Sequence, residues 1–147
     1  MDSAQPLPSH WRFPGFRSLF ASAAVGIGAV LIAAPLTAFS QHVLHQPPET
    51  LQIASALVLM TMVPLEEWFF RGVVLRQLLR FGRVLAVSVS AAAFAAVHLS
   101  AVGFLPRLAG GLVLGVLYLR TLSLWAPIAA HLTYNTAIVT LALLARF

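Results

Sequence analysis

The chain contains no cysteine and no lysine, and only four of its 147 residues are carboxylates. The lack of cysteine excludes thiol catalysis, thiolate metal sites and a disulfide scaffold. Hydrophobic residues make up 60% of the sequence and charged residues only 9%. This balance excludes a disordered chain, and it excludes the solvated basic face that a nucleic-acid partner would need. The composition therefore predicts a membrane protein.

Long apolar runs predict helices that cross the membrane. About 20 apolar residues span the hydrocarbon layer, and the runs lack the alternation expected of barrel strands. We expect an all-α, polytopic bundle of about five transmembrane helices, with the glycine-rich fourth segment shorter than the others. The five segments are Ser18–Phe39, Leu51–Leu79, Val84–Gly103, Leu108–Leu119 and Leu124–Leu144.

The first apolar run follows a polar tail, residues 1–17, and we expect residues 18–147 to form a single transmembrane domain. A cleaved signal peptide is the alternative for this run, because Ala38 and Ser40 are small residues placed before Gln41. The run is longer than the 7 to 15 apolar residues typical of a signal peptide, so we favour a retained helix. In the second segment, Pro64 is the expected kink.

The nine arginines predict the orientation of the bundle. A cytoplasmic N-terminus leaves Arg107 and Arg146 outside, and the positive-inside rule favours this arrangement. We therefore expect an integral protein of a bacterial cell membrane with its N-terminus in the cytoplasm. The arginines then placed on the inside are Arg12, Arg17, Arg76, Arg80, Arg83 and Arg120.

A few polar residues interrupt the apolar segments. Each charge at that depth costs at least about 2.5 to 3.5 kcal/mol, so such residues are usually functional and face the bundle interior. Helix rise places most of them about 16 to 21 Å from the cytoplasmic helix ends, and His131 at about 10 Å. We therefore expect one buried site formed by Glu66, Glu67, Arg71, His98, His131 and Asn135.

The spacing of these residues suggests distinct roles. Glu67 and Arg71 are four residues apart and are expected to form an ion pair on one helix face. Glu66 points about 100° away, which leaves it free to act as an acid or base. Either histidine alone could be a hydrogen-bonded core residue. Asn135 could orient His131, donate to an oxyanion or join two helices.

Three short motifs resemble those of the CPBP family, the CAAX proteases and bacteriocin-processing enzymes also called Abi. They are EEWFFRG at Glu66–Gly72, FAAVH at Phe94–His98 and HLTYN at His131–Asn135. The resemblance implies an intramembrane endopeptidase that acts on a membrane-associated peptide or a prenylated protein. It also implies that Glu66 is the catalytic glutamate, supported by the pair Glu67 and Arg71, and that the remaining site residues are His98, His131 and Asn135.

Two mechanisms fit these residues. In the first, Glu66 activates water, and His131 with Asn135 stabilises the oxyanion. In the second, a zinc ion held by Glu66, His98 and His131 lowers the pKa of its bound water. The sequence contains no HExxH motif, and we favour the first.

Two functions of another class also remain open. One is a non-catalytic membrane scaffold or immunity protein. The other is a proton or ion transporter, which would need a polar track to both membrane faces. The sequence shows no such track.

Overall fold

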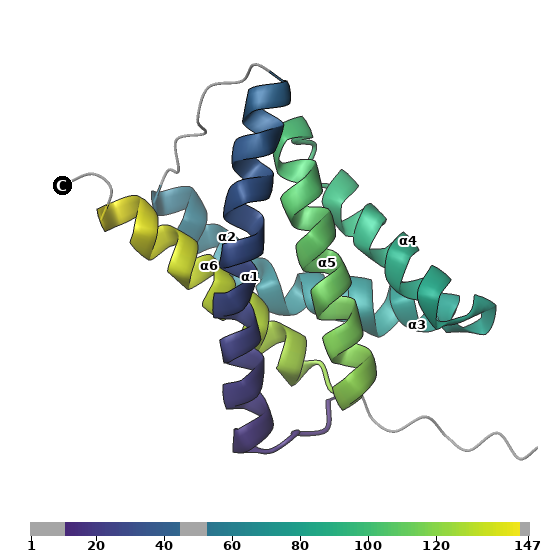
Figure 1. Cartoon of the computed structure of the whole chain (residues 1–147). Helices are drawn as coiled ribbons and strands as arrows, with labels where there is room; N and C mark the ends of the chain where they lie inside the picture. Colours follow the sequence, from purple (N-terminus) through teal and green to yellow (C-terminus); the bar gives the residue numbers. More distant parts are fainter. Residues whose placement is uncertain (1–10, 45–52, 145–147) are drawn as a thin grey trace, which may run out of the picture.

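The computed structural model describes residues 11–44 and 53–144, which form a bundle of helices with no strand in these two ranges (Figure 1). The expected all-α fold of about five long helical segments is confirmed. Three helices, α1, α5 and α6, are long and apolar enough to cross a membrane. The helices are α1 (Phe16–Val43), α2 (Ile53–Glu67), α3 (Arg76–Leu78), α4 (Arg83–Ala96), α5 (Ala101–Thr121) and α6 (Trp125–Leu144).

Helix α1 begins two residues before the expected start and extends four residues beyond the expected end. Its hydroxyl groups are bound within the helix, since Ser22 donates to the carbonyl of Ser18 and Thr37 to that of Ala33. It packs along α5 and α6 (Figure 1). Several large apolar side chains, including Phe20 and Leu31, face outward, which suits a lipid-facing surface.

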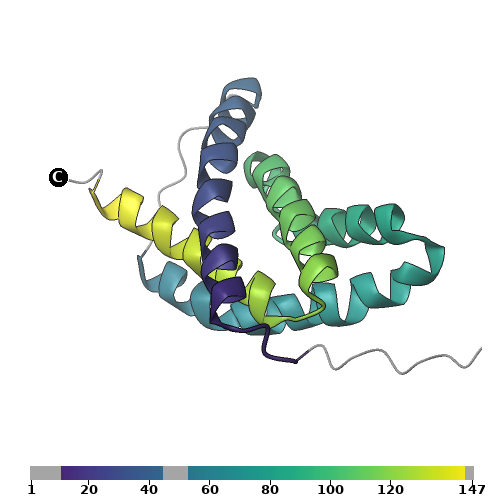
Figure 2. The ribbon, with the colours of Figure 1, turned by 60° about the horizontal axis from the view of Figure 1, so that its bottom comes forward.

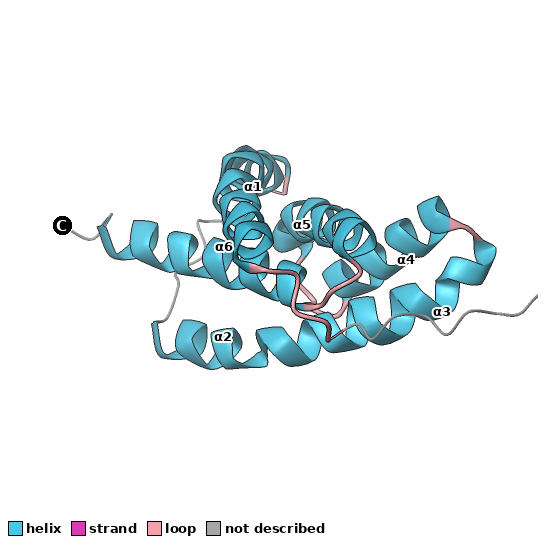
Figure 3. Ribbon diagram, turned by 90° about the horizontal axis from the view of Figure 1, so that it is seen from below, coloured by secondary structure: helices cyan, strands magenta, loops and turns pink. Residues whose placement is uncertain are grey.

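The second expected helix is a continuous helical rod with an irregular middle. After α2, the chain forms a π-helix, Trp68–Leu75, then α3 and a 3-10 turn, Leu79–Phe81. Seen from below, with α1 and α5 viewed nearly end-on, this rod lies to one side of both helices and runs crosswise to them (Figure 3). Pro64 lies inside α2, and the irregular geometry starts four residues after it. The π-helix leaves room for the Ser90 hydroxyl of α4 to donate to the carbonyl of Phe70.

The third and fourth segments differ from the expected ones. Helix α4 ends at Ala96 rather than Gly103, and a turn of four residues leads into α5. Helix α5 has 21 residues instead of the expected twelve-residue stretch Leu108–Leu119. The break occurs where Leu99 adopts a φ of 50° and where the Ser100 side chain caps α5 by accepting from the amide of Gly103.

Helices α4 and α5 approach closely at Gly111. A Cβ at this position would come within 2.9 Å of the Ala91 Cβ, so only glycine allows this spacing. The helices α2 and α6 lie side by side, and α6 passes behind α1 in the view of Figure 2. The buried core joins α2, α4, α5, α6 and the π-helix through Val63, Leu75, Ala86, Val87, Tyr118, Leu124 and Ile128.

The segment before α1 is attached to the α5–α6 connection. The Ser123 hydroxyl donates to the carbonyl of Arg12, and the Trp125 indole donates to that of Trp11. The two tryptophan rings also meet edge to face. Expectations for residues 1–10, 45–52 and 145–147, including most of the polar tail, most of the loop before α2 and Arg146, lie outside the described residues.

Candidate active site

Glu67 is the centre of the buried polar cluster. Its side chain is completely inaccessible, and its Oε1 atom accepts from Arg71 Nη1 at 3.0 Å. The same oxygen lies 2.8 Å from His131 Nδ1. The ion pair expected from the spacing of Glu67 and Arg71 is therefore present, and α6 supplies a third member. Because a buried ion pair is tolerated only with further hydrogen bonds, the histidine contact helps to stabilise the carboxylate.

His131 has a defined tautomer in this arrangement. A carboxylate paired with arginine can only accept hydrogen bonds, so His131 Nδ1 carries the proton that it donates to Glu67. The Nε2 atom of the neutral ring is then an acceptor. It faces Glu66, with Nε2 and Oε2 3.9 Å apart. This distance is too long for a direct hydrogen bond but suits one bridging water.

Glu66 differs from its neighbour in exposure. Its side chain is 23% accessible, whereas that of Glu67 is 0% accessible. Among the residues that the structure places, Glu66 makes no hydrogen bond within normal distance; the 3.9 Å contact with His131 is its nearest ionic partner. The sequence predicted that Glu66 would have no partner in its own helix. It did not predict that the nearest partner would come from α6.

Arg71 connects three elements of the site. Besides its bond to Glu67, its Nη2 atom donates to the carbonyl of Gly111 on α5 at 3.2 Å. Its guanidinium carbon lies 4.8 Å from the centre of the Phe94 ring on α4. The side chain is fully buried, and these contacts satisfy Nη1 and Nη2, whereas Nε has no hydrogen-bond partner within the described residues. Arg71 therefore fixes the relative positions of the π-helix, α4 and α5 at the site.

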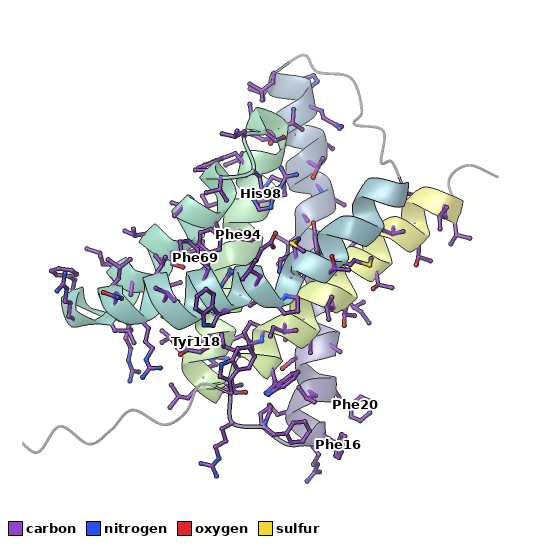
Figure 4. The ribbon with its side chains drawn as sticks, turned by 180° about the vertical axis from the view of Figure 1, so that it is seen from behind. Phe16, Phe20, Phe69, Phe94, His98 and Tyr118 are labelled. Atoms are coloured by element: carbon purple, nitrogen blue, oxygen red, sulfur yellow. The ribbon has the colours of Figure 1, made fainter. Side chains whose placement is uncertain are left out.

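The ring of Phe94 contacts both histidines of the site. Its buried ring contacts His98 edge to face at 4.9 Å and His131 at 5.7 Å between ring centroids. Figure 4 shows His98 and Phe94 in succession toward the end of α4. His98 lies in the turn after α4 rather than within a helix. Its Nδ1 donates to the carbonyl of Phe94 at 2.7 Å, which leaves Nε2 free.

Asn135 follows His131 by one turn of α6 and shares its face. It is partly exposed and makes no hydrogen bond within the described segments. The structure thus places Glu66, Glu67, Arg71 and His131 in direct proximity, with His98 joined through Phe94. Sequence reasoning missed Phe94 as a contact of both histidines and the carbonyl of Gly111. The closely spaced glycines Gly110, Gly111 and Gly115 did indicate a close approach of helices, which was the available signal for the contact at the Gly111 carbonyl.

Glu66, His98 and His131, the ligands of the alternative zinc mechanism, are not arranged as a metal site in the described residues. No three histidine or acidic side chains of residues 11–44 and 53–144 are grouped so that they could hold an ion. Each imidazole donates from Nδ1, His131 to Glu67 and His98 to a backbone carbonyl, and this leaves both Nε2 atoms open, as in metal-bound histidines. The donors as placed in the described residues are nevertheless not grouped closely enough to fit a zinc ion.

The fold and the site together define an integral membrane protein whose helices enclose a cluster of glutamate, arginine and histidine. The chain matches the family model described as type II CAAX prenyl endopeptidase Rce1-like over residues 47–137. It belongs to this family, which is one of CAAX-type proteases. The matched range contains all six candidate site residues. No curated protein and no solved structure matches the chain.

Proposed function

We propose that the chain is an intramembrane endopeptidase in which Glu66 activates a water molecule for attack on a peptide bond. The observation that supports this is the 3.9 Å gap between Glu66 Oε2 and His131 Nε2. Both atoms are acceptors, so a water between them can donate one hydrogen to each. The lone pairs of its oxygen then remain available for a carbonyl carbon.

The reaction can be written with Glu66 as the proton carrier. Glu66 takes a proton from water as the new bond between oxygen and carbon forms, and the carbonyl oxygen becomes negative. The side-chain amide of Asn135, on the same face as His131, is the proposed donor to this oxyanion. Glu66 then returns the proton to the amine nitrogen as the carbon–nitrogen bond breaks. Both product termini are thereby complete.

The other residues are assigned supporting roles in this proposal. Glu67 holds the His131 tautomer, and Arg71 neutralises Glu67 and anchors it to α5. His98 is a second imidazole at the site, positioned by Phe94. We propose as substrates membrane-associated peptides, including prenylated ones, since the matched family is named for them. Residues 18–147 are the proposed single catalytic domain.

The direct test measures cleavage by purified protein in lipid vesicles. General acid–base catalysis contributes about 10² to 10⁴ in rate, so Glu66→Gln should lose at least about 100-fold in kcat/KM. Thr136→Ala, an exposed change on α6, serves as a control and should keep full activity. Comparison of membrane peptides between cells with the wild type and cells with Glu66→Ala would identify the substrate. Retained cleavage by the Glu66 variants would contradict the proposal.

The proposed orientation has the N-terminus in the cytoplasm. Its support is the arginine distribution, with Arg12 and Arg17 next to the start of α1 and Arg120 in the last turn of α5. Accessibility of tags at both ends of the chain tests it. An external N-terminal tag would reverse the proposed sidedness.

A further inference from the structure

Helix α1 supplies none of the candidate site residues, but it packs against the helix that carries His131. At Gly26, a Cβ would overlap the carbonyl oxygen of Ala130 and would lie 2.9 Å from the carbonyl carbon of the same residue. Both residues are buried. The backbones of α1 and α6 therefore meet directly where the two helices cross, and only glycine on α1 allows this approach. Ala130 directly precedes His131 in the sequence.

Helix α6 lies between α1 and the rod that carries the two glutamates (Figure 3). On the side of α1, the carbonyl of Ala130 packs on Gly26. Consecutive residues of a helix point about 100° apart, and the next side chain, that of His131, reaches the rod and contacts Glu67 and Glu66. A movement of α6 relative to α1 therefore changes the distances from the imidazole to both glutamates.

A second attachment joins the same two helices near the beginning of α6. The buried Ser123 hydroxyl donates to the carbonyl of Arg12 at 2.6 Å, and the Trp125 indole donates to the carbonyl of Trp11 at 3.1 Å. The segment before α1 thus binds the start of α6, and α1 itself contacts α6 again at Ala130. Two contacts along the first turns of α6 fix both the depth and the rotation of this helix.

We propose that Gly26 is a positioning residue for His131 and that α1 thereby sets the gap between this imidazole and Glu66. The gap of 3.9 Å between Nε2 and Oε2 suits one bridging water. A misplacement of about 1 Å, caused by a change remote from the chemistry, can cost about 100-fold in rate. Helix α1 precedes residues 47–137, the range that matches the family model. The effect of Gly26 on cleavage rests on the proposed function, whereas its effect on the imidazole does not.

Two glycines of α1 provide a matched pair for the experiment. Gly26→Ala adds a methyl group that must displace α6, so kcat for a prenylated peptide in lipid vesicles should fall about 10- to 100-fold while KM changes little. Gly28→Ala meets no atom within 4 Å and should keep the kcat of the wild type. Both changes replace glycine by alanine within the same helix, so the comparison isolates the contact with Ala130. Equal kcat of the two variants would overturn the proposal.

Nitrogen NMR of protein labelled at histidine reads the state of His131 without cleavage. In the wild type, Nδ1 should carry the proton and Nε2 should not, because Nδ1 donates to Glu67. The variant His131→Gln identifies the signal by its loss. Gly26→Ala should mix the two tautomers, and Gly28→Ala should leave the signal unchanged. A merely structural role of Gly26 would lower the unfolding temperature without altering the tautomer, and this outcome would overturn the proposal.

Ser123→Ala provides a second variant in case Gly26→Ala yields no folded protein. It removes the hydrogen bond to the carbonyl of Arg12 and leaves the crossing at Gly26 intact. Loss of this one bond should lower kcat by about 2- to 10-fold and should shift the His131 signal away from that of the wild type. Unchanged kcat together with an unchanged signal would refute the positioning by α1.

Failure of the proposed function has a different signature. In that case, the wild type would cleave no peptide, but the His131 signal would still respond to Gly26→Ala and not to Gly28→Ala. This result would support the positioning role and contradict the proteolytic one. Cleavage by the wild type that Gly26→Ala leaves unchanged would refute the positioning role alone.

Discussion

His131 donates from Nδ1 to Glu67 across 2.8 Å, and this bond joins the rod formed by α2 and the π-helix to α6. It leaves Nε2 as the ring nitrogen that is presented to Glu66. The two adjacent glutamates consequently contribute differently: Glu67 is inaccessible and bound within the protein, whereas the side chain of Glu66 is partly accessible.

This difference predicts opposite effects of the same substitution at adjacent positions. Glu67→Ala removes one partner of a buried ion pair, so it should lower the free energy of unfolding by about 3 to 5 kcal/mol. Glu66→Ala removes a partly exposed group without a hydrogen bond and should leave stability nearly unchanged while abolishing cleavage. Thermal unfolding in detergent, measured beside peptide cleavage, separates the two. Equal unfolding temperatures would contradict the assignment of Glu67.

Phe94 is predicted to act through the residues that its ring contacts. Phe94→Leu keeps an apolar side chain but removes the ring that Arg71, His98 and His131 share. We expect kcat to fall more than KM rises. The loss in free energy of unfolding should be smaller than that of Phe94→Ala, for which about 3 to 5 kcal/mol is typical. A loss of activity that only follows the loss of folded protein would indicate packing alone.

The two consecutive glycines of α5 provide a matched pair. Gly111→Ala would push α4 away by contact with Ala91 and displace the carbonyl that binds Arg71. It should lower both stability and activity. Gly110→Ala meets no atom within 4 Å, so it should be neutral or stabilise the helix by up to about 1 kcal/mol. Unfolding temperatures and cleavage rates of the two variants test this, and equal behaviour would refute the close contact.

Metal content provides the test between the two mechanisms. With Glu66 as the base, purified protein should keep its activity after treatment with a chelator and dialysis. The measurement is elemental analysis together with cleavage rates. Stoichiometric zinc that is lost together with activity in His98→Ala would replace the glutamate mechanism with a zinc-dependent one.

The lengths of the apolar runs in the sequence were sufficient to predict the helical segments but not all of their ends. The turn after α4 lies within an apolar run, since Val97 and Leu99 are as hydrophobic as helix residues, and only Ser100 signals the cap. The Glu67–Arg71 pair was predictable because it depends on spacing within one helix. The bond from His131 to Glu67 was not, because it depends on how α6 is rotated against α2. The hydrogen bond from Arg71 Nη2 to the carbonyl of Gly111 likewise depends on how the helices pack, and it was not predictable.

The π-helix between Trp68 and Leu75 makes the catalytic geometry sensitive to chain length at this point. Removal of one residue there would leave hydropathy and span almost unchanged. It would nevertheless rotate the glutamate pair by about 100° about the helix axis relative to Leu75, which is anchored in the core. His131 would then lose its contacts with both glutamates. Substitutions of the exposed residues Trp68 and Phe69 can therefore be tolerated where insertions and deletions cannot. Alignments of related chains should be ungapped between the glutamates and the core leucine.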